Sequence, residues 1–285
     1  MKEKRRTPGA MADKIKAELK KEAEEKGLHP SALRKHFAFD MLINRLCQNA
    51  PGVFILKGGY LMELRIVTGR TTLDLDLLMR MKKIFDSFES MAMFMRRTLA
   101  DAVEDPLGEH DLFSFNFGEA SREIDGGGGG ARFPVKLILG GKTFEDFHVD
   151  LAMEDIETRI ASVRKTPVIP PLSGQQFEME GITAEQHFAE KVHAYTRPRK
   201  NGNSRIKDFV DLYLLVQTSL NVKETKEVLV DVFEFWSTHE LPKNLPFPPD
   251  EWRNGFSSMV SELAMAGLSL EDAHKIVAEF YEDLL

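Results

Sequence analysis

The pair of aspartates at positions 74 and 76 has the clearest chemical capacity in this sequence. The two residues stand in the run LDLDL, where leucines and acidic residues alternate. In a β-strand this alternation places both carboxylates on one face, about 7 Å apart along the chain, and the leucines on the other. One divalent cation or a close pair can bind between two such carboxylates. The sequence therefore predicts a metal-binding strand over residues 73–78, although solvated strand faces also show such pairs without function.

Glycines and small polar residues precede the acidic pair in a defined order. An apolar run at residues 53–56 ends at Gly58-Gly59, a helical stretch follows, and Gly69-Arg70-Thr71-Thr72 leads into the pair. The order resembles that of nucleotidyltransferases with the polymerase-beta-like fold, in which glycines let the backbone approach a triphosphate and two aspartates hold Mg²⁺ against its oxygens. The resemblance assigns the donor nucleotide to Gly58, Gly59, Arg70 and Thr72, whereas an isolated Asp-x-Asp is weak evidence.

Asp150 is the candidate for a third carboxylate. It belongs to the run FHVDL, in which His148 and Asp150 share one strand face. Sites of this kind need a carboxylate from a neighbouring strand to complete the metal site and to accept the proton of an attacking hydroxyl. Asp150 is therefore interpreted as a metal ligand and catalytic residue beside Asp74 and Asp76. An aspartate that simply faces solvent at a strand end is the alternative, and the sequence does not separate the two.

Lys191 lies within the apolar stripe of a predicted helix, three residues after Phe188. A lysine in that position either extends its amine to solvent or meets a negative partner. The next predicted helix carries Asp208 and Asp211 at i, i+3. In one interpretation the lysine and an aspartate form a buried pair that fixes two helices together. In the other, Lys191 binds a triphosphate oxygen while Asp208 and Asp211 hold it in place, and the two roles are compatible.

One basic segment stands out in a chain whose net charge is -7. Residues 197–207 contain five basic residues and no acidic one: Arg197, Arg199, Lys200, Arg205 and Lys207. Lysine and arginine neutralise phosphates and supply most of the non-specific affinity for nucleic acid. The segment therefore favours an RNA acceptor, although a charge run is usually a solvated loop.

The elements that position these residues change from mixed to helical along the chain. Helices are predicted over residues 11–26, from Ser31 to the residues before Pro51, and over 82–104. Strands are predicted over 53–56, 73–78, 113–117, 135–139 and 144–151, with a glycine-rich surface loop at 126–130 and a two-residue hairpin turn at Gly140-Gly141. Residues 155–180 contain three prolines and are predicted to connect two lobes.

Beyond residue 183 the pattern predicts only helices. They cover about 183–195, 204–220 and 222–238, and two more follow the proline-rich stretch at 241–250, the last capped by Ser269. The prediction is an α+β protein with three parts. N-terminal helices (1–50) pack on a core with a mixed sheet (51–165), and a helical lobe (166–285) follows.

Composition excludes several classes of protein. A chain of 285 residues that is 42% hydrophobic can bury a core, so it is not disordered or fibrous. The single cysteine, Cys47, excludes an internal disulfide framework and suits a reducing compartment. No apolar run approaches the roughly 20 residues needed to cross a bilayer. We expect a cytoplasmic protein without a membrane partner.

Five motifs in the same order as in the AbiEii/AbiGii toxins of bacterial toxin–antitoxin systems span residues 53–216. They are Lys57-Gly58-Gly59, Glu63-Leu64-Arg65, the segment from Arg70 to Asp76, the segment from Glu190 to Ala194, and Lys207 to Leu212. The chain resembles this family, which implies a polymerase-beta-like nucleotidyltransferase core and transfer of a nucleotide from an NTP with Mg²⁺, or Mn²⁺ as an alternative. It further implies that Lys191 and Asp211 are catalytic, that Asp208 assists nucleotide binding, that the acceptor is RNA, foremost the 3′ end of tRNA, and that a cognate antitoxin is encoded nearby.

One position departs from the wider fold, and two other functions stay open. Many of these enzymes have Gly-Ser after the first strand, whereas Gly59 lacks the hydroxyl that would contact phosphate. A transferase that modifies a small molecule, such as an antibiotic, or a protein hydroxyl has nearly the same sequence features. A catalytically inert binding module is the third possibility, and the intact Asp74, Asp76 and Lys191 argue against it because binding alone needs no metal ligands.

Overall fold

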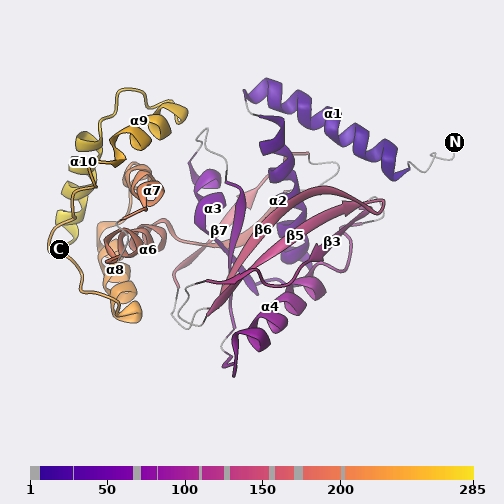
Figure 1. Ribbon diagram of the computed structural model, residues 1–285, viewed down its shortest axis with the longest axis horizontal. Helices are drawn as coiled ribbons and strands as arrows, with labels where there is room; N and C mark the ends of the chain where they lie inside the picture. Colours follow the sequence, from indigo (N-terminus) through magenta and orange to yellow (C-terminus); the bar gives the residue numbers. More distant parts are fainter. Residues whose placement is uncertain are drawn as a thin grey trace. The chain divides into compact units, whose positions relative to one another are not determined.

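The computed structural model describes the chain in nine stretches (Figure 1): residues 7–27, 29–66, 72–81, 83–108, 111–124, 129–153, 158–169, 176–199 and 203–285. The chain divides into two compact units. Unit 1 contains Met1–Leu61, Thr71–Asp155 and Ser162–Gly181, and unit 2 contains Met62–Arg70, Ile156–Ala161 and Ile182–Leu285. The N-terminal helices belong to unit 1, and the main boundary falls after Gly181.

A mixed sheet forms the framework of unit 1. Its described strands are β1 (Phe54–Lys57), β2 (Asp74–Met79), β3 (Phe113–Phe117), β4 (Arg122–Glu123), β5 (Gly130–Leu139), β6 (Lys142–Met153), β7 (Ile160–Lys165) and β8 (Phe177–Ile182). Their order is β3-β5-β6-β2-β1-β8-β7, with β4 paired to β5. The pairs β2–β6 and β1–β8 are parallel, whereas β1–β2 and β5–β6 are antiparallel. The predicted mixed sheet is confirmed.

Alternation along β2 separates a buried face from a functional one. Leu75 and Leu77 are fully buried, while Asp74 and Asp76 lie on the opposite face and are partly exposed. Leu73, which the sequence placed on the buried face, is 63% exposed because the strand begins only at Asp74. The turn between β5 and β6 is as predicted, since Gly140 and Gly141 have φ values of +59° and +77°, the left-handed values that a type I′ turn needs.

The prediction that residues 155–180 only connect two lobes is wrong. This stretch supplies β7 and β8, and β8 pairs with β1 through Leu56 and Gly181. β7 is an edge strand whose side chains are mostly exposed, so it lacks the apolar alternation that identifies a half-buried strand.

Helices of unit 1 pack on this sheet (Figure 1): α1 (Pro8–Lys26), α2 (Pro30–Asn49), α4 (Phe88–Ala102) and the first turn of α3 (Gly58–Arg65). α2 contacts β6, and α4 contacts β3 and β5. The ring of Phe39 packs edge-on against Phe147 at 5.1 Å between centroids. Two predicted helix starts need correction. α2 is capped by His29 instead of Ser31, and α4 begins at Phe88 because Ser87 caps it.

Unit 2 is dominated by helices α6 (Ala184–Thr196), α7 (Ile206–Val216), α8 (Val222–Trp236), α9 (Trp252–Glu262) and α10 (Leu270–Leu284). The predicted cap Ser269 is confirmed, and Thr183 caps α6; each side chain accepts a hydrogen bond from the backbone N–H three residues on. One apolar core joins these helices around residues such as Phe188, Phe209 and Tyr281. The helix predicted over 204–220 is shorter and ends at Val216. Among the described residues, no helix has the length and apolar character needed to span a bilayer.

Candidate active site

A row of charged residues crosses the sheet of unit 1. The strand register places Lys57 beside Asp76, Asp76 beside Asp150, Asp150 beside Arg132, and Arg132 beside Arg122. Neighbouring strands lie about 4.8 Å apart, so each of these side chains is within reach of the next. The two central carboxylates are thus flanked by cationic residues on both sides, and the strand pairing confirms that Asp76 and Asp150 are brought together.

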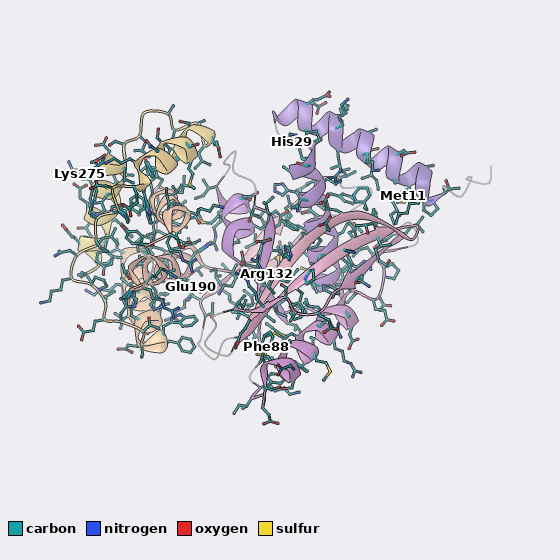
Figure 2. The ribbon with its side chains drawn as sticks, viewed as in Figure 1. Met11, His29, Phe88, Arg132, Glu190 and Lys275 are labelled. Carbon is teal, nitrogen blue, oxygen red and sulfur yellow. The ribbon has the colours of Figure 1, made fainter. Side chains whose placement is uncertain are left out.

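Arg132, which Figure 2 labels on the sheet, binds two of the three predicted carboxylates. Its Nε donates to Asp150 Oδ1 at 2.6 Å, and its Nη2 donates to Asp150 Oδ2 at 2.7 Å and to Asp74 Oδ2 at 3.0 Å. Paired, parallel hydrogen bonds of this kind are among the strongest ion pairs in proteins. The hydrogen bond to Asp150, with the charges of Asp150 and Asp74, raises the pKa of Arg132 above its ordinary value.

Asp74 is the more exposed end of this network. Its Oδ1 lies 3.5 Å from Nδ1 of His148, the residue beside it on β6. About a third of the Asp74 side chain is accessible, compared with 13% of Asp150. A ligand arriving from solvent therefore meets Asp74 before Asp150.

The first turn of α3 lies directly against the acidic pair because its first two residues are glycines. Gly58 has a φ of +64°, and a Cβ added to it would overlap the Asp76 carboxylate. A Cβ on Gly59 would lie 2.8 Å from Oγ1 of Thr72. The first amides of a helix have no partner within the helix and attract anions. The two glycines thus let the start of α3 lie close to Asp76 and Thr72, and their contact with a donor nucleotide stays a prediction.

The carboxylates offer only hard oxygen ligands, the kind that Mg²⁺ and Mn²⁺ bind. Asp74 and Asp76 share one strand face, and the overlap at Gly58 shows that the space beside Asp76 excludes a side chain. Within the described part of the chain, however, no three acidic or imidazole side chains converge on one point as a metal site. The hydrogen bonds of Asp74 and Asp150 are made to Arg132. The donor atoms of these three carboxylates are of the chemical kind that a divalent cation binds.

A second cluster lies in unit 2, between α6 and α7. Nζ of Lys191 lies 2.6 Å from Oδ1 of Asp208 and 2.8 Å from Oδ2 of Asp211, and both aspartates are buried. Burial alone favours the neutral amine, but the two carboxylates outweigh it and raise the pKa of Lys191. Burial opposes the charge of Asp208 in the same way, but Lys191 and Arg205 lower its pKa. Lys191 is therefore a charged amine held by both predicted partners.

The basic segment is only partly available to a ligand. Arg205 lies 3.3 Å from Asp208, and Arg199 donates to the carbonyl of Ala194. Lys207 is exposed, whereas Lys200 lies outside the described residues. Arg70, predicted to bind the donor nucleotide, also lies outside them, as do Gly69 and Thr71.

Sequence reasoning missed Arg132 and Arg122. The strand that carries Arg132 was predicted to begin at residue 135, but β5 begins at Gly130, the last residue of the glycine run. The available signal was the alternation of Arg132 and Lys136 with the apolar residues Ala131, Phe133, Val135 and Leu137. In a strand, this alternation places both basic residues on the face opposite the apolar ones.

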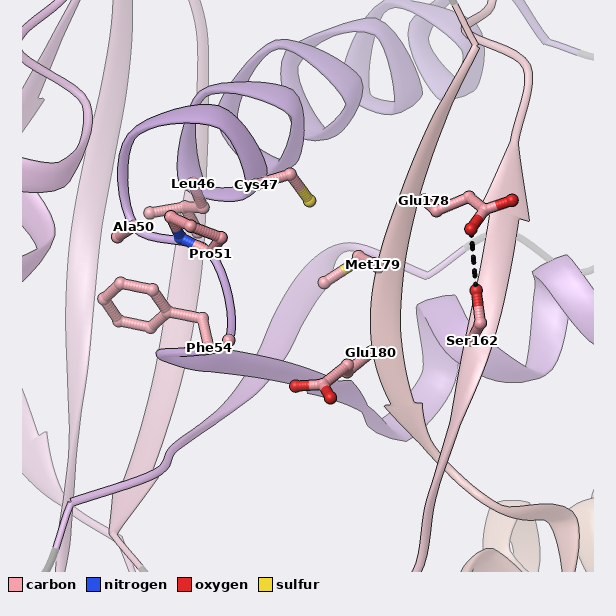
Figure 3. Close-up of a pocket in the computed structure, with 10 residues that line it drawn as sticks. Leu46, Cys47, Ala50, Pro51, Phe54, Ser162, Glu178, Met179 and Glu180 are labelled. Carbon is pink, nitrogen blue, oxygen red and sulfur yellow. Dashed lines mark hydrogen bonds between the residues drawn. The ribbon is translucent and has the colours of Figure 1, made fainter.

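A surface pocket lies at the opposite end of β1 from the carboxylates (Figure 3). Phe54, Leu46, Cys47 and Met179 line it together with Glu180. Burial raises the pKa of the Cys47 thiol to about 12, so this thiol is not a nucleophile at neutral pH. Glu180 pairs with Arg80 at 3.1 Å. None of these residues belongs to the predicted site.

Comparisons with known proteins agree with the fold. The family described as "Nucleotidyl transferase AbiEii toxin, Type IV TA system" matches residues 45–277. MenT4, a nucleotidyltransferase toxin of Mycobacterium tuberculosis H37Rv, superposes with a TM-score of 0.56 at 13% identity, over 94% of this chain and 97% of that one. JHP933 from Helicobacter pylori gives a TM-score of 0.47 at 15% identity, over 90% of this chain and 93% of that one. The search of curated proteins found no match.

Proposed function

This chain belongs to the AbiEii family of nucleotidyltransferase toxins, and on that premise we propose that it transfers a nucleotide from an NTP to the 3′ end of an RNA, foremost a tRNA. The close approach of Gly58 to the Asp76 carboxylate carries the proposal. A backbone without side chains beside a carboxylate pair is the arrangement that a triphosphate and its cation require. A carboxylate pair that only faced solvent at the end of a strand would not require this close approach of the backbone.

Asp74, Asp76 and Asp150 would hold Mg²⁺, or Mn²⁺ in its place. When bound, the cation supplies positive charge against the triphosphate oxygens. The amides at the start of α3, together with Thr72 and Arg70, bind the donor. Asp150 accepts the proton of the 3′-hydroxyl as its oxygen forms a bond to the α-phosphorus, and the bond to the pyrophosphate leaving group breaks.

Lys191 binds a phosphate oxygen of the donor, and Asp208 and Asp211 hold its amine in position. The two short contacts to buried carboxylates support this role, because they fix the amine and keep it charged. Asp211 acts through Lys191 in this assignment.

Charge complementarity favours RNA over a small-molecule acceptor or a protein hydroxyl, because Arg197 and Lys207 add positive charge to a surface segment of an otherwise acidic protein. Toxins of this kind are opposed by an antitoxin, so we further propose that a neighbouring gene encodes one. Its product would restore growth of cells that express this chain.

One experiment tests donor and acceptor together. Purified protein is incubated with Mg²⁺, total RNA and each of the four labelled NTPs in turn, and the label is followed into RNA, protein and small molecules. Label at the 3′ end of tRNA is expected, with none after chelation of the metal. Label in protein or in a small molecule, but not in RNA, would contradict the proposed acceptor.

The basic segment has a separate test. Replacement of Arg197, Lys200 and Lys207 by Gln should weaken RNA binding and flatten its salt dependence, while the affinity for NTP stays the same. An unchanged salt slope would show that the segment is an ordinary loop.

A further inference from the structure

Two groups that the proposed reaction needs are already bound to a cation that the chain supplies. Both oxygens of Asp150 accept hydrogen bonds from Arg132, at 2.6 and 2.7 Å, and Asp74 accepts a third at 3.0 Å. The Arg132 side chain is only 21% exposed. The guanidinium is thus partly buried, and it donates hydrogen bonds to both carboxylates.

We propose that Arg132 is the resident counter-cation of this site, and that a divalent metal ion binds only by displacing it from Asp74 and Asp150. The inference rests on the proposed function, because it assumes that these carboxylates are metal ligands. It makes Arg132 a positioning residue that holds the acidic groups together until the metal replaces it.

Electrostatics explain why such a residue is needed. Asp76 and Asp150 are paired across adjacent parallel strands, and Asp74 lies on the same face two residues away. Carboxylates that share a site repel one another. Arg132 lies beside Asp150 on the next strand, where it neutralises part of this charge.

The same geometry makes the arginine a competitor of the metal. Each Asp150 oxygen already accepts a hydrogen bond from the guanidinium, so two of the roughly four lone-pair sites of this carboxylate are occupied. A divalent ion bound beside Arg132 would also be repelled by it. Metal binding must therefore break the paired hydrogen bonds, and the affinity of the site for metal is lower than the carboxylates alone would give.

The test is Mn²⁺ binding by the purified full-length chain, followed by the loss of the electron paramagnetic resonance signal of free Mn²⁺. Arg132→Gln removes the competitor, so its Kd for Mn²⁺ should fall about tenfold or more. Without metal this variant should melt at a lower temperature than the wild type, and Mn²⁺ should raise its melting temperature by more. A purely structural arginine predicts a lower melting temperature with equal or weaker metal binding.

Two matched variants separate contact from charge. Arg122→Gln removes the same charge 3.9 Å from Asp150, on a side chain that is 58% exposed, and should change the Kd much less. Arg132→Lys keeps the charge without the paired geometry, so its Kd should lie between those of the wild type and Arg132→Gln. Arg132→Lys also tests the proposal if Arg132→Gln does not fold.

The outcomes distinguish this inference from the proposed function. Unchanged or weaker Mn²⁺ binding in both Arg132 variants would overturn the role of Arg132 alone. If Asp76→Asn binds Mn²⁺ as tightly as the wild type, the metal site itself is misassigned. If Arg122→Gln gains as much affinity as Arg132→Gln, overall charge is the cause and displacement is wrong.

Discussion

The two aspartates of β2 have different surroundings, and Asp76 is the sharper test of the site. Asp74 contacts Arg132 and His148, whereas Asp76 lies under Gly58. We expect Asp76→Asn to abolish transfer and toxicity while leaving the melting temperature close to that of the wild type, because the change removes charge but keeps size. Growth arrest by a folded Asp76→Asn protein would refute the carboxylate site.

Asp150 has a separate prediction because its proposed role is in proton transfer. Asp150→Asn should lower the transfer rate by about 10²–10⁴-fold with donor binding retained. Since this change also weakens the pair with Arg132, the melting temperature is measured alongside. Normal turnover in Asp150→Asn would make this residue a structural partner of Arg132 only.

Lys191 carries stability as well as function. Its removal would leave Asp208 and Asp211 buried without their lysine, so Lys191→Met should lower the free energy of unfolding by about 3–5 kcal/mol. The double variant Lys191→Met/Asp211→Asn should recover part of this loss, because it removes one of the two buried carboxylate charges that the loss of Lys191 leaves unpaired. Lys191→Arg keeps the positive charge, so it can be used to test donor binding. The measurement is the rise in its melting temperature when NTP is added, compared with the same rise in the wild type. If Lys191→Met unfolds at the wild-type denaturant concentration, the ion pairs contribute little.

Site residues that follow a local sequence period could be identified from the sequence. Site residues that come together only through pairing between strands could not. The alternation around Asp74 and the helical spacing of Asp208 and Asp211 are visible in the sequence itself. Arg132 meets Asp150 only because a hairpin of two long strands folds back with these two residues opposite each other. No local pattern encodes that register, and the predicted strand started too late to include the arginine.

At the level of elements, the α3 glycines should be intolerant of side chains for two reasons. Gly58→Ala introduces left-handed strain of about 1–2 kcal/mol and also a clash with Asp76. Gly27→Ala is the matched control, because Gly27 has the same φ of +64° and nothing within 4 Å of an added Cβ. Denaturant unfolding should show a larger loss for Gly58→Ala, and only this variant should lose transfer. Equal losses of stability and full activity in both would remove the argument for close approach.

Helices were predicted better than strands for a physical reason. Caps such as Thr183 and Ser269 act within one turn of the helix, so their signal is contained in a few neighbouring residues. β7 and β8 have no such signal. β8 is a strand because it pairs in parallel with β1, which is far away in the sequence, and β7 lies beside β8 at the edge of the sheet. The unpredicted part of the fold is therefore the part that depends on long-range pairing.

At the scale of the whole molecule, the helical unit should lose stability in mild acid. Burial, and then the neighbouring His239 and Arg197, lower the pKa of His193 to about 4. Burial and Arg197 also lower the pKa of His239. Histidine in an unfolded chain titrates near about 6.5, so between that pH and about 4 the unfolded state binds more protons. The free energy of unfolding should therefore decrease as the pH falls through this window.

Urea unfolding at a series of pH values measures this effect. The His193 ring is stacked on Trp236 at 5.7 Å, so tryptophan fluorescence should follow the transition. His193→Gln should flatten the pH dependence, because glutamine does not titrate. The same slope in that variant would assign the acid sensitivity to other groups.

The parallel pairing of β2 with β6 has a consequence for the making of this protein. Asp76 and Asp150 are neighbours on the sheet, yet α4, β3 and β5 are synthesised between them. Lys191 and Asp211 follow only after β8 has completed the sheet. Domains fold from the N-terminus as they leave the ribosome, and parallel pairing cannot begin before its second strand emerges. A growing chain therefore lacks Lys191 and Asp211, two of the proposed site residues, until α7 has left the exit tunnel.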